Sequence, residues 1–131
     1  MNAWKNENLF YLTSNKLRLL KIIDHYEIYK RIINIKGDII ECGVFKGISL
    51  IRFLSFRDLL EKSKKRKIFA FDIFGKFPRP KNKKIRSQKN DVNFAKSHDL
   101  KIGRGFKLEK LNSFLKKKKF SNYKLIKGDV N

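Results

Sequence analysis

The chain has 131 residues and a formal net charge of +21 at pH 7, with 33 Lys and Arg against 12 Asp and Glu. Its hydrophobic content of 41% suffices for the core of one domain, and its single cysteine, Cys42, excludes an internal disulfide and suits a reducing compartment. The first residues do not resemble a signal peptide, and the most apolar stretch, 48–56, is too short to span a bilayer. We therefore expect a cytoplasmic protein with no membrane segment.

The basic charge raises the possibility of a nucleic-acid-binding protein. The Lys and Arg residues are spread through nearly every segment, however, and the densest runs, 62–67 and 116–119, fall where we expect loops or helix ends. No predicted helix gathers basic and aromatic residues on one face. A solvated basic surface is the preferred interpretation, and nucleic-acid binding, with its steep salt dependence, is the alternative.

Helical and strand-like patterns alternate along the chain. Apolar spacing predicts helices at 15–34, 47–61, 91–97 and 106–120, the first of them capped by Ser14 or Asn15. Short apolar runs predict buried strands at 39–44, 68–72 and 123–127. Glycine, proline and polar residues predict loops at 62–67, 73–80 and 103–105 and a polar, mobile loop at 81–90.

This order predicts an α/β, doubly wound fold, because parallel strands are joined by helical crossovers. We divide the chain into an N-terminal helical segment, 1–36, and an α/β unit, 37–131. Folds of this kind bind ligands beyond the carboxyl ends of their strands. Three motifs fall at such ends, at 41–49, 72–78 and 128–129.

The first motif ends a strand and opens a helix. Gly43 would let the backbone approach a ligand closely, and Gly47 would allow tight entry into the helix. The spacing is not that of a phosphate-binding loop, and the carboxylate of Glu41 would repel a phosphate. Glu41 suits a ligand with an ammonium group, although an ordinary strand-to-helix turn explains the pattern equally well.

The other two motifs are also acidic. Asp72 follows the second strand, where a carboxylate can accept hydrogen bonds from both hydroxyls of a ribose. Capping of the next turn is the competing role for this side chain. Asp129 after the third strand has two interpretations as well, adenine recognition and an ordinary Gly-Asp turn.

These motifs resemble those of the macrocin O-methyltransferase (TylF-like) family. Residues 37–47 match the signature G-D-x-x-E-C-G-V-x-x-G, and 71–78 resemble the segment F-D-x-F-x-G-x-P. Residues 125–130 are similar to the strand end that follows. Gly75 and Lys76 depart from the acidic-Gly pair that is usual in the second motif.

The resemblance implies a Rossmann-like class I methyltransferase fold that uses S-adenosylmethionine to methylate a hydroxyl of a sugar or related small molecule. By this resemblance Glu41 and the 43–47 turn hold the methionine part of the cofactor, Asp72 binds its ribose, and Asp129 lies near its adenine. The cofactor-binding residues implied in this way are Glu41, Gly43, Val44, Gly47, Ser49, Asp72, Phe74 and Asp129.

Members of the family continue into a fourth strand with an Asp-x-Asp type motif, which binds a divalent metal such as Mg²⁺ and positions the acceptor hydroxyl. The chain ends at Asn131, so we expect an incomplete fold of three parallel strands with flanking helices, without catalytic or metal-binding residues. Such a unit leaves a strand edge open, which predicts marginal stability and either self-association or a complementing chain. A degenerate half that serves as a partner subunit is the remaining alternative.

Overall fold

The computed structural model describes residues 2–63, 65–75 and 86–128, with the side chains of all of these except 86–91. The strands are β1 (Ile39–Cys42), β2 (Ile68–Asp72) and β3 (Tyr123–Lys127). The helices are α1 (Ala3–Thr13), α2 (Lys16–Ile32), α3 (Ile48–Leu60), α4 (Arg86–Lys101) and α5 (Leu108–Lys117). Both α1 and α2 fall within the predicted helical segment, 1–36.

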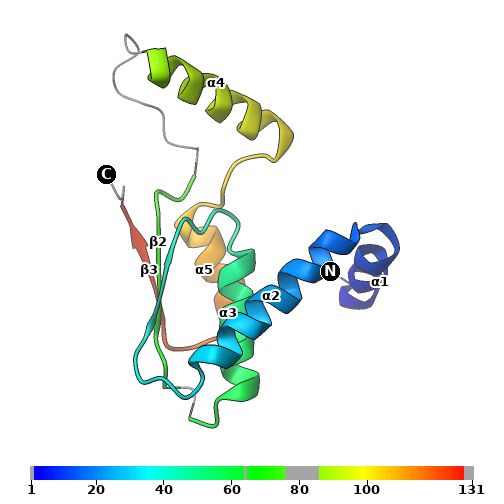
Figure 1. The fold of residues 1–131 in the computed structure, drawn as a ribbon, viewed down its shortest axis with the longest axis vertical. Coiled ribbons are helices and arrows are strands. Elements are labelled where there is room, and N and C mark those ends of the chain that lie inside the picture. Colours follow the sequence, from blue (N-terminus) through cyan, green and yellow to red (C-terminus); the bar gives the residue numbers. More distant parts are fainter. Residues whose placement is uncertain (1, 64, 76–85, 129–131) are drawn as a thin grey trace.

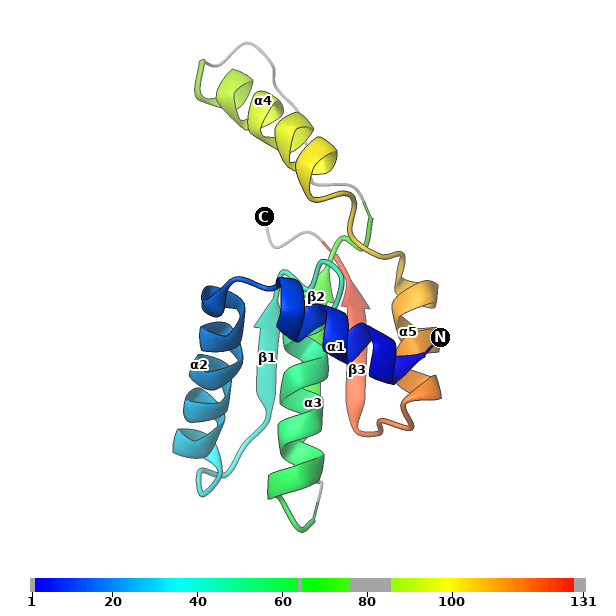
Figure 2. The ribbon, with the colours of Figure 1, turned by 90° about the vertical axis from the view of Figure 1, so that its right-hand side faces the viewer.

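The strands form a parallel sheet in the order β1-β2-β3 (Figure 1). Ile39 pairs with Ile68 across the first two strands, and Ile68 pairs with Tyr123 across the next two. The predicted α/β arrangement of three parallel strands with flanking helices is therefore confirmed. Because the strands are parallel, all three carboxyl ends lie at the same edge of the sheet (Figure 2).

The core lies between the sheet and the helices α3 and α5, which Figure 1 shows on one side of the sheet together with α2. Alternate residues of β2, Ile68 and Ala70, point to this side and are fully buried. The buried apolar residues of this core are Val44, Leu50, Leu54, Ile68, Ala70, Phe74, Leu111 and Leu115. Since β2 pairs on both edges and packs on these helices, it is the centre of the unit.

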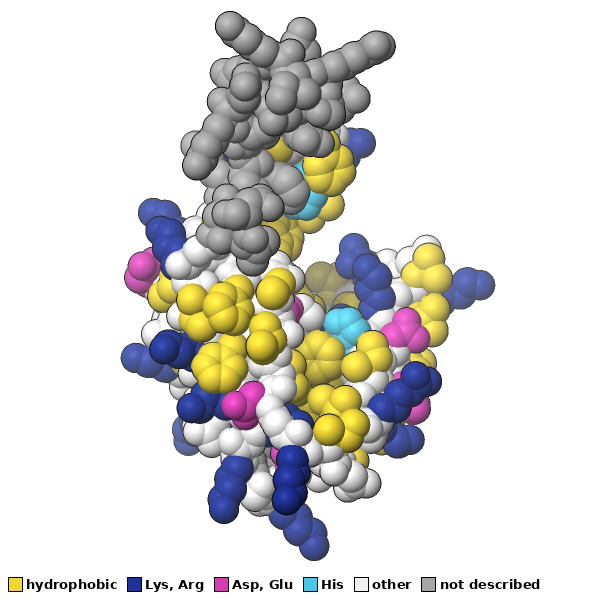
Figure 3. All heavy atoms as spheres, turned by 60° about the vertical axis from the view of Figure 1, so that its left-hand side comes forward, with side chains coloured by type: hydrophobic (Ala, Val, Ile, Leu, Met, Phe, Trp, Pro, Cys, Tyr) yellow, Lys and Arg dark blue, Asp and Glu magenta, His cyan; other side chains and the backbone are white. Residues whose placement is uncertain are grey.

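No described helix covers the opposite face of the sheet. Ile40 is 68% exposed there, and its neighbours in register on β2 and β3 are Phe69 and Lys124. The prediction of a buried strand at 39–44 is therefore wrong for Ile40, because the described helices lie on one side of the sheet and every second side chain of β1 faces away from them. Figure 3 shows hydrophobic side chains gathered on this side of the molecule, with Lys and Arg around them.

The fourth helix differs most from its prediction. Residues 86–90, expected to belong to a mobile loop, are part of α4, which is 16 residues long instead of the expected seven at 91–97. Residues 81–85 lie outside the described residues. Among the residues of α4 whose side chains the structure describes, 92–101, Ala95 is buried. The first six residues of α4, 86–91, include no apolar residue, so apolar spacing does not mark this part of the helix.

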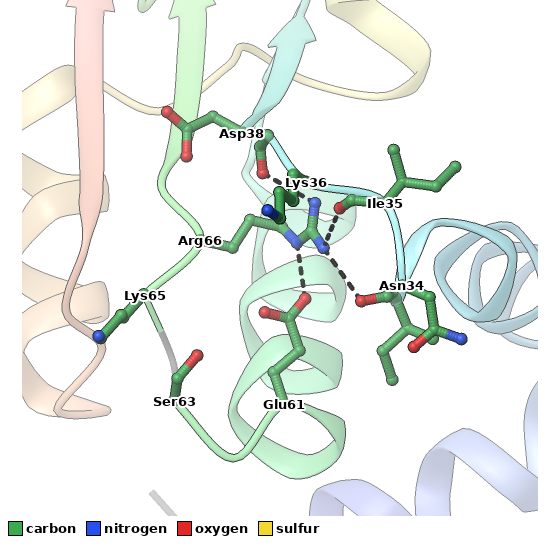
Figure 4. A pocket seen from close by; sticks show the side chains of 10 residues that line it. Asn34, Ile35, Lys36, Asp38, Glu61, Ser63, Lys65 and Arg66 are labelled. Carbon is green, nitrogen blue, oxygen red and sulfur yellow. Dashed lines mark hydrogen bonds and ion pairs between the residues drawn. The ribbon is translucent and has the colours of Figure 1, made fainter.

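The amino ends of the strands are held by a junction around Arg66. Its guanidinium donates to the carboxylate of Glu61 (2.6 Å), which also accepts a hydrogen bond from the hydroxyl of the buried Tyr29. The same guanidinium caps the end of α2 and the turn that follows. Its carbonyl acceptors are those of Ile32, Ile33, Ile35 and Gly37. Figure 4 shows the guanidinium of Arg66 between Glu61 and Ile35. These residues line a hollow of about 360 Å³.

A second arginine of this junction, Arg57, is fully buried on α3. It donates to the carbonyl of Arg66 (3.1 Å), which precedes β2, and to the carbonyl of Asn122 (3.0 Å), which precedes β3. The carboxylate of Asp58 accepts from its other nitrogens at 2.8–2.9 Å. Arg57 therefore fixes one helix to the starts of two strands. Among the described helices none is both long and apolar enough to cross a membrane.

Candidate functional site

Two loops meet at the carboxyl edge of the sheet, the one from β1 into α3 (43–47) and the one that follows β2 (73–75). Asp72, the last residue of β2, joins them. Its Oδ2 accepts hydrogen bonds from the backbone amides of Val44 (2.7 Å) and Phe45 (2.9 Å), and its Oδ1 accepts one from the amide of Phe74 (2.7 Å). Of the two roles considered for this carboxylate, the structure shows the capping of turns.

Glu41 is the second acidic residue at this edge. Its Oε1 accepts a hydrogen bond from the hydroxyl of Ser49 in the first turn of α3. Its Oε2 is buried and has no hydrogen-bond partner among the described residues. Burial raises the pKa of Glu41; the Ser49 hydroxyl opposes this rise, and the negative charge of Asp72 adds to it. A buried acceptor without a donor is uncommon in a folded protein and marks this oxygen as a candidate for ligand contact.

The two glycines of the first loop have different surroundings. Both have positive φ, +85° at Gly43 and +76° at Gly47. A Cβ at Gly47 would lie 2.5 Å from a methyl carbon of Leu111, so this glycine is required for the packing of α3 on α5. A Cβ at Gly43 would meet nothing within 4 Å. The backbone at Gly43 is therefore open to a ligand, while Gly47 is part of the fold.

Backbone strain is concentrated in the same loops. Phe45 has φ of 54° and Phe74 has φ of 51°, a left-handed conformation that is unfavourable for bulky residues. Asp72 holds the amides of both. Such strain persists only where the surrounding structure imposes it, and it is frequent at ligand-binding sites. The Asp72 carboxylate supplies that constraint here.

The segment between α4 and α5 includes 103–105, for which the sequence predicts a loop. It packs directly on the first loop, because the amide of Phe106 donates to the carbonyl of Phe45 (2.9 Å). A Cβ at Gly105 would lie 3.1 Å from the carbonyl oxygens of Phe45 and Gly75. The glycine at 105 was the one available signal, and without the tertiary structure it could not be assigned to this contact.

Helix α4 stands beyond the carboxyl edge of the sheet (Figures 1 and 2). The ring of His98 on this helix lies edge-on to the ring of Phe45, with 5.5 Å between their centroids. The ammonium of Lys46 donates to the carbonyl of Ile102 just after the helix (2.8 Å). Both contacts tie α4 to the loop that carries Gly43.

The structure brings four of the predicted residues together with groups available to a ligand: Glu41, Gly43, Ser49 and Asp72. Three others are engaged in the fold. The side chains of Val44 and Phe74 are buried in the core, and Gly47 packs against Leu111. Asp129 and residues 76–78 of the second motif lie outside the described residues. In the part of the chain that the structure describes, no group of three or more His, Cys, Asp or Glu could hold a metal ion.

These features define an α/β protein with an acidic candidate site at the carboxyl ends of parallel strands, the usual position of ligands in this class of fold. The family model of macrocin-O-methyltransferase (TylF) matches residues 15–129. The chain therefore belongs to the TylF family, and O-methyltransferase activity is the activity of that family. The search of curated proteins found no match.

Proposed function

We propose that this chain is the cofactor-binding unit of a cytoplasmic, S-adenosylmethionine-dependent O-methyltransferase with a Rossmann-like class I fold. The observation that carries the proposal is the unpartnered, buried Oε2 of Glu41 at the carboxyl edge of the sheet. Membership of the TylF family supports it independently. The acceptor we propose is a hydroxyl of a sugar or related small molecule.

Glu41 fits the methionine end of this cofactor, which carries an ammonium group. An ammonium at Oε2 would supply the missing donor and offset the burial that raises the pKa of the carboxyl. The open backbone at Gly43 leaves space for the approach of the ligand. A phosphate would be repelled by the same carboxylate, so the site favours an ammonium-bearing ligand over a phosphate-bearing nucleotide.

Asp72 can contribute to ribose binding in a restricted way. A carboxylate offers about four acceptor positions, and in this structure three are occupied by the amides of Val44, Phe45 and Phe74. One ribose hydroxyl can bind without rearrangement. Binding of both would require the release of an amide, and release of either Phe45 or Phe74 would relieve an unfavourable backbone conformation.

When bound, the cofactor supplies an electrophilic methyl group. The described residues of this chain bind and orient the ligand: Glu41 would fix the ammonium, Ser49 holds Glu41 in place, and Asp72 keeps the two loops together. We assign the cofactor no catalytic partner within the described residues.

Calorimetric titration with S-adenosylhomocysteine tests the proposal. The wild-type chain should bind, and Glu41→Gln should weaken binding about 10- to 100-fold, the loss expected for a charge-assisted hydrogen bond. Methylthioadenosine, which has the ribose and adenine but no ammonium, should bind both proteins equally. The matched control, Glu109→Gln, makes the same charge change on the exposed face of α5 and should have no effect.

Failure of a folded sample to bind S-adenosylhomocysteine would refute the assignment. An equal loss of both ligands in Glu41→Gln would refute the specific role of Glu41. Binding of a DNA or RNA oligonucleotide that falls steeply with salt and is unchanged in Glu41→Gln would favour the nucleic-acid alternative.

A further inference from the structure

The contact between helices α2 and α3 contains a histidine, His25 of α2. The two helices pack through aromatic rings such as those of Tyr29 and Phe56, and Figure 1 shows them side by side. The ring of His25 is stacked on that of Phe53 of α3, with 5.1 Å between their centroids and 13° between their planes. Arg52 directly precedes Phe53, and its positive charge acts on His25. His25 and Arg52 are therefore neighbours at this contact.

Further basic residues of α2 lie on the same side of the helix as His25. Arg18, Lys21 and His25 are spaced three and four residues apart, which places them along one face of an α-helix. Burial lowers the pKa of His25, and the positive charge of Arg52 lowers it further. The carboxylate of Asp24 acts in the opposite direction, and the ammonium of Lys21 lowers the pKa again. The surroundings of this imidazole are therefore mainly positive.

Arg52 is a half-buried cation without a counter-ion. Its guanidinium makes no hydrogen bond or ion pair with the residues that the structure describes, whereas Arg57 and Arg66 are both paired with carboxylates. Burial lowers the pKa of Arg52, and the positive charge of Arg18 lowers it further. Nδ1 of His25 is buried and also lacks a partner in the described part of the chain. Because charges removed from water are normally paired in proteins, this group of cations calls for an anion from outside the chain.

The unpaired arginine lies one helical turn from the candidate site. Arg52 and Ser49 are three residues apart on α3 and therefore share a face of the helix. The hydroxyl of Ser49 donates to Glu41. Side chains on an α-helix lean toward its amino end, which for α3 lies at the carboxyl edge of the sheet. Two anions fit this position, the carboxylate at the amino-acid end of the proposed cofactor and a separate small oxyanion.

We propose that the guanidinium groups of Arg18 and Arg52 bind an oxyanion, a carboxylate, phosphate or sulfate group, at the junction of α2 and α3. A guanidinium matches the geometry of these groups, because it can donate two parallel hydrogen bonds to them. Lys21 adds a third positive charge, and the bound anion favours the protonated form of His25. Since each helix supplies one arginine, the anion also links α2 to α3. The site does not depend on the proposed function, because a free oxyanion is sufficient to occupy it.

Titration of the wild-type chain with sulfate tests the site, because sulfate stays fully charged over the pH range in which a histidine titrates. The chain has two histidines, so proton NMR follows His25 and His98 separately. Sulfate at a concentration on the order of 1 mM should raise the pKa of His25 and leave the resonances of His98 in place. Chloride at the same ionic strength should have neither effect.

Two matched variants separate a specific site from general attraction to a basic protein. Arg52→Gln should weaken sulfate binding, measured by calorimetry, about 10- to 100-fold, the loss expected for a charge-assisted hydrogen bond. Without sulfate it should raise the pKa of His25, because it removes a neighbouring positive charge. Arg31→Gln makes the same charge change at the exposed end of α2 and should have no effect on either quantity. Circular dichroism verifies that both variants are folded.

Competition identifies the source of the oxyanion. S-adenosylhomocysteine carries the carboxylate, and methylthioadenosine lacks it. Displacement of sulfate by the first compound alone would support the site and assign it to the carboxylate of the cofactor. Sulfate binding that persists in the presence of both would support a separate oxyanion. Because sulfate itself is the probe, a chain that does not bind S-adenosylhomocysteine still gives a result for this site.

Two results would overturn the proposal. The first is a folded wild-type chain in which sulfate and chloride have the same effect on His25. The second is an equal loss of sulfate binding in Arg52→Gln and Arg31→Gln, which would show diffuse attraction to the basic surface of the protein.

Discussion

At the amino ends of the strands the buried arginines and carboxylates are paired with one another, whereas at the carboxyl ends one buried carboxylate oxygen, Oε2 of Glu41, has no partner among the described residues. Arg57 and Arg66 donate to backbone carbonyls and to the carboxylates of Asp58 and Glu61. Glu41 keeps a buried oxygen without a partner, and the loops around it hold strained backbone. One end of the sheet is built for stability, and the other retains the unsatisfied chemistry that a ligand can use.

Breaking the ion pairs and hydrogen bonds of Arg57 and Arg66 at the amino ends should destabilise the folded protein. Removing one member of a buried ionic network leaves the others without partners in a medium of low dielectric constant. Neutralising Glu41, by contrast, removes the charge of a buried carboxylate whose Oε2 already lacks a partner among the described residues. Removal of a paired arginine at the amino ends and neutralisation of Glu41 at the carboxyl ends should therefore differ in the sign as well as the size of their effects on stability.

The largest effect is expected for Arg57→Ala. It removes a fully buried guanidinium, leaves the carbonyls of Arg66 and Asn122 without this donor, and opens a cavity. We expect a loss of about 3–5 kcal/mol in the free energy of unfolding, measured by urea denaturation. The exposed Arg104→Ala serves as the control and should change stability by less than about 0.5 kcal/mol. An effect no larger than that of the control would show that the junction contributes little.

The next effect is expected for Asp72→Ala, which removes the acceptor of three loop amides. Stability should fall by about 2–4 kcal/mol. The amides of Val44 and Phe45 should exchange with deuterium much faster than in the wild type. Asp24→Ala, an exposed change on α2, is the control. Unchanged protection of both amides in the variant would contradict the capping role of Asp72.

A smaller loss is expected for Gly47→Ala. The substitution forces a left-handed conformation on alanine and places its Cβ against Leu111, for a cost of about 2–3 kcal/mol in thermal or urea unfolding. Gly128→Ala, where nothing lies within 4 Å and φ is not positive, should be nearly neutral. Combining Gly47→Ala with Leu111→Ala should cost less than the sum of the two changes. Strict additivity would argue against the contact.

The smallest effect has the opposite sign and depends on pH. Folding raises the pKa of Glu41 through burial. Protonation of this carboxyl therefore makes its full contribution to the free energy of unfolding at a pH below the pKa in the unfolded state, about 4.3. That contribution is lost as the pH rises through the pKa in the folded state. In the absence of ligand, Glu41→Gln should therefore stabilise the protein by about 1 kcal/mol at about pH 7 and have little effect at about pH 4. Chemical denaturation at the two pH values tests this. An equal effect at both would show that the ionisation of Glu41 is not responsible.

Much of the architecture was predictable from local patterns. The three strands, the helices α2, α3 and α5, and the position of the motifs at strand ends followed from apolar periodicity and glycine positions, because these reflect which side of an element is buried. Two errors have physical causes. Helix α4 is too polar to show periodicity, and Ile40 lies on a face that no described helix covers.

The sequence by itself determined the order of elements, the acidic strand ends and the family, because these depend on residue type and spacing along the chain. Only the tertiary structure decided which polar groups are satisfied. It showed that Asp72 is occupied by amides while Glu41 keeps a free oxygen, that Gly47 is needed for packing while Gly43 is open, and that residues 105–106 complete the site. These differences arise from contacts between residues far apart in the chain, which local spacing does not encode.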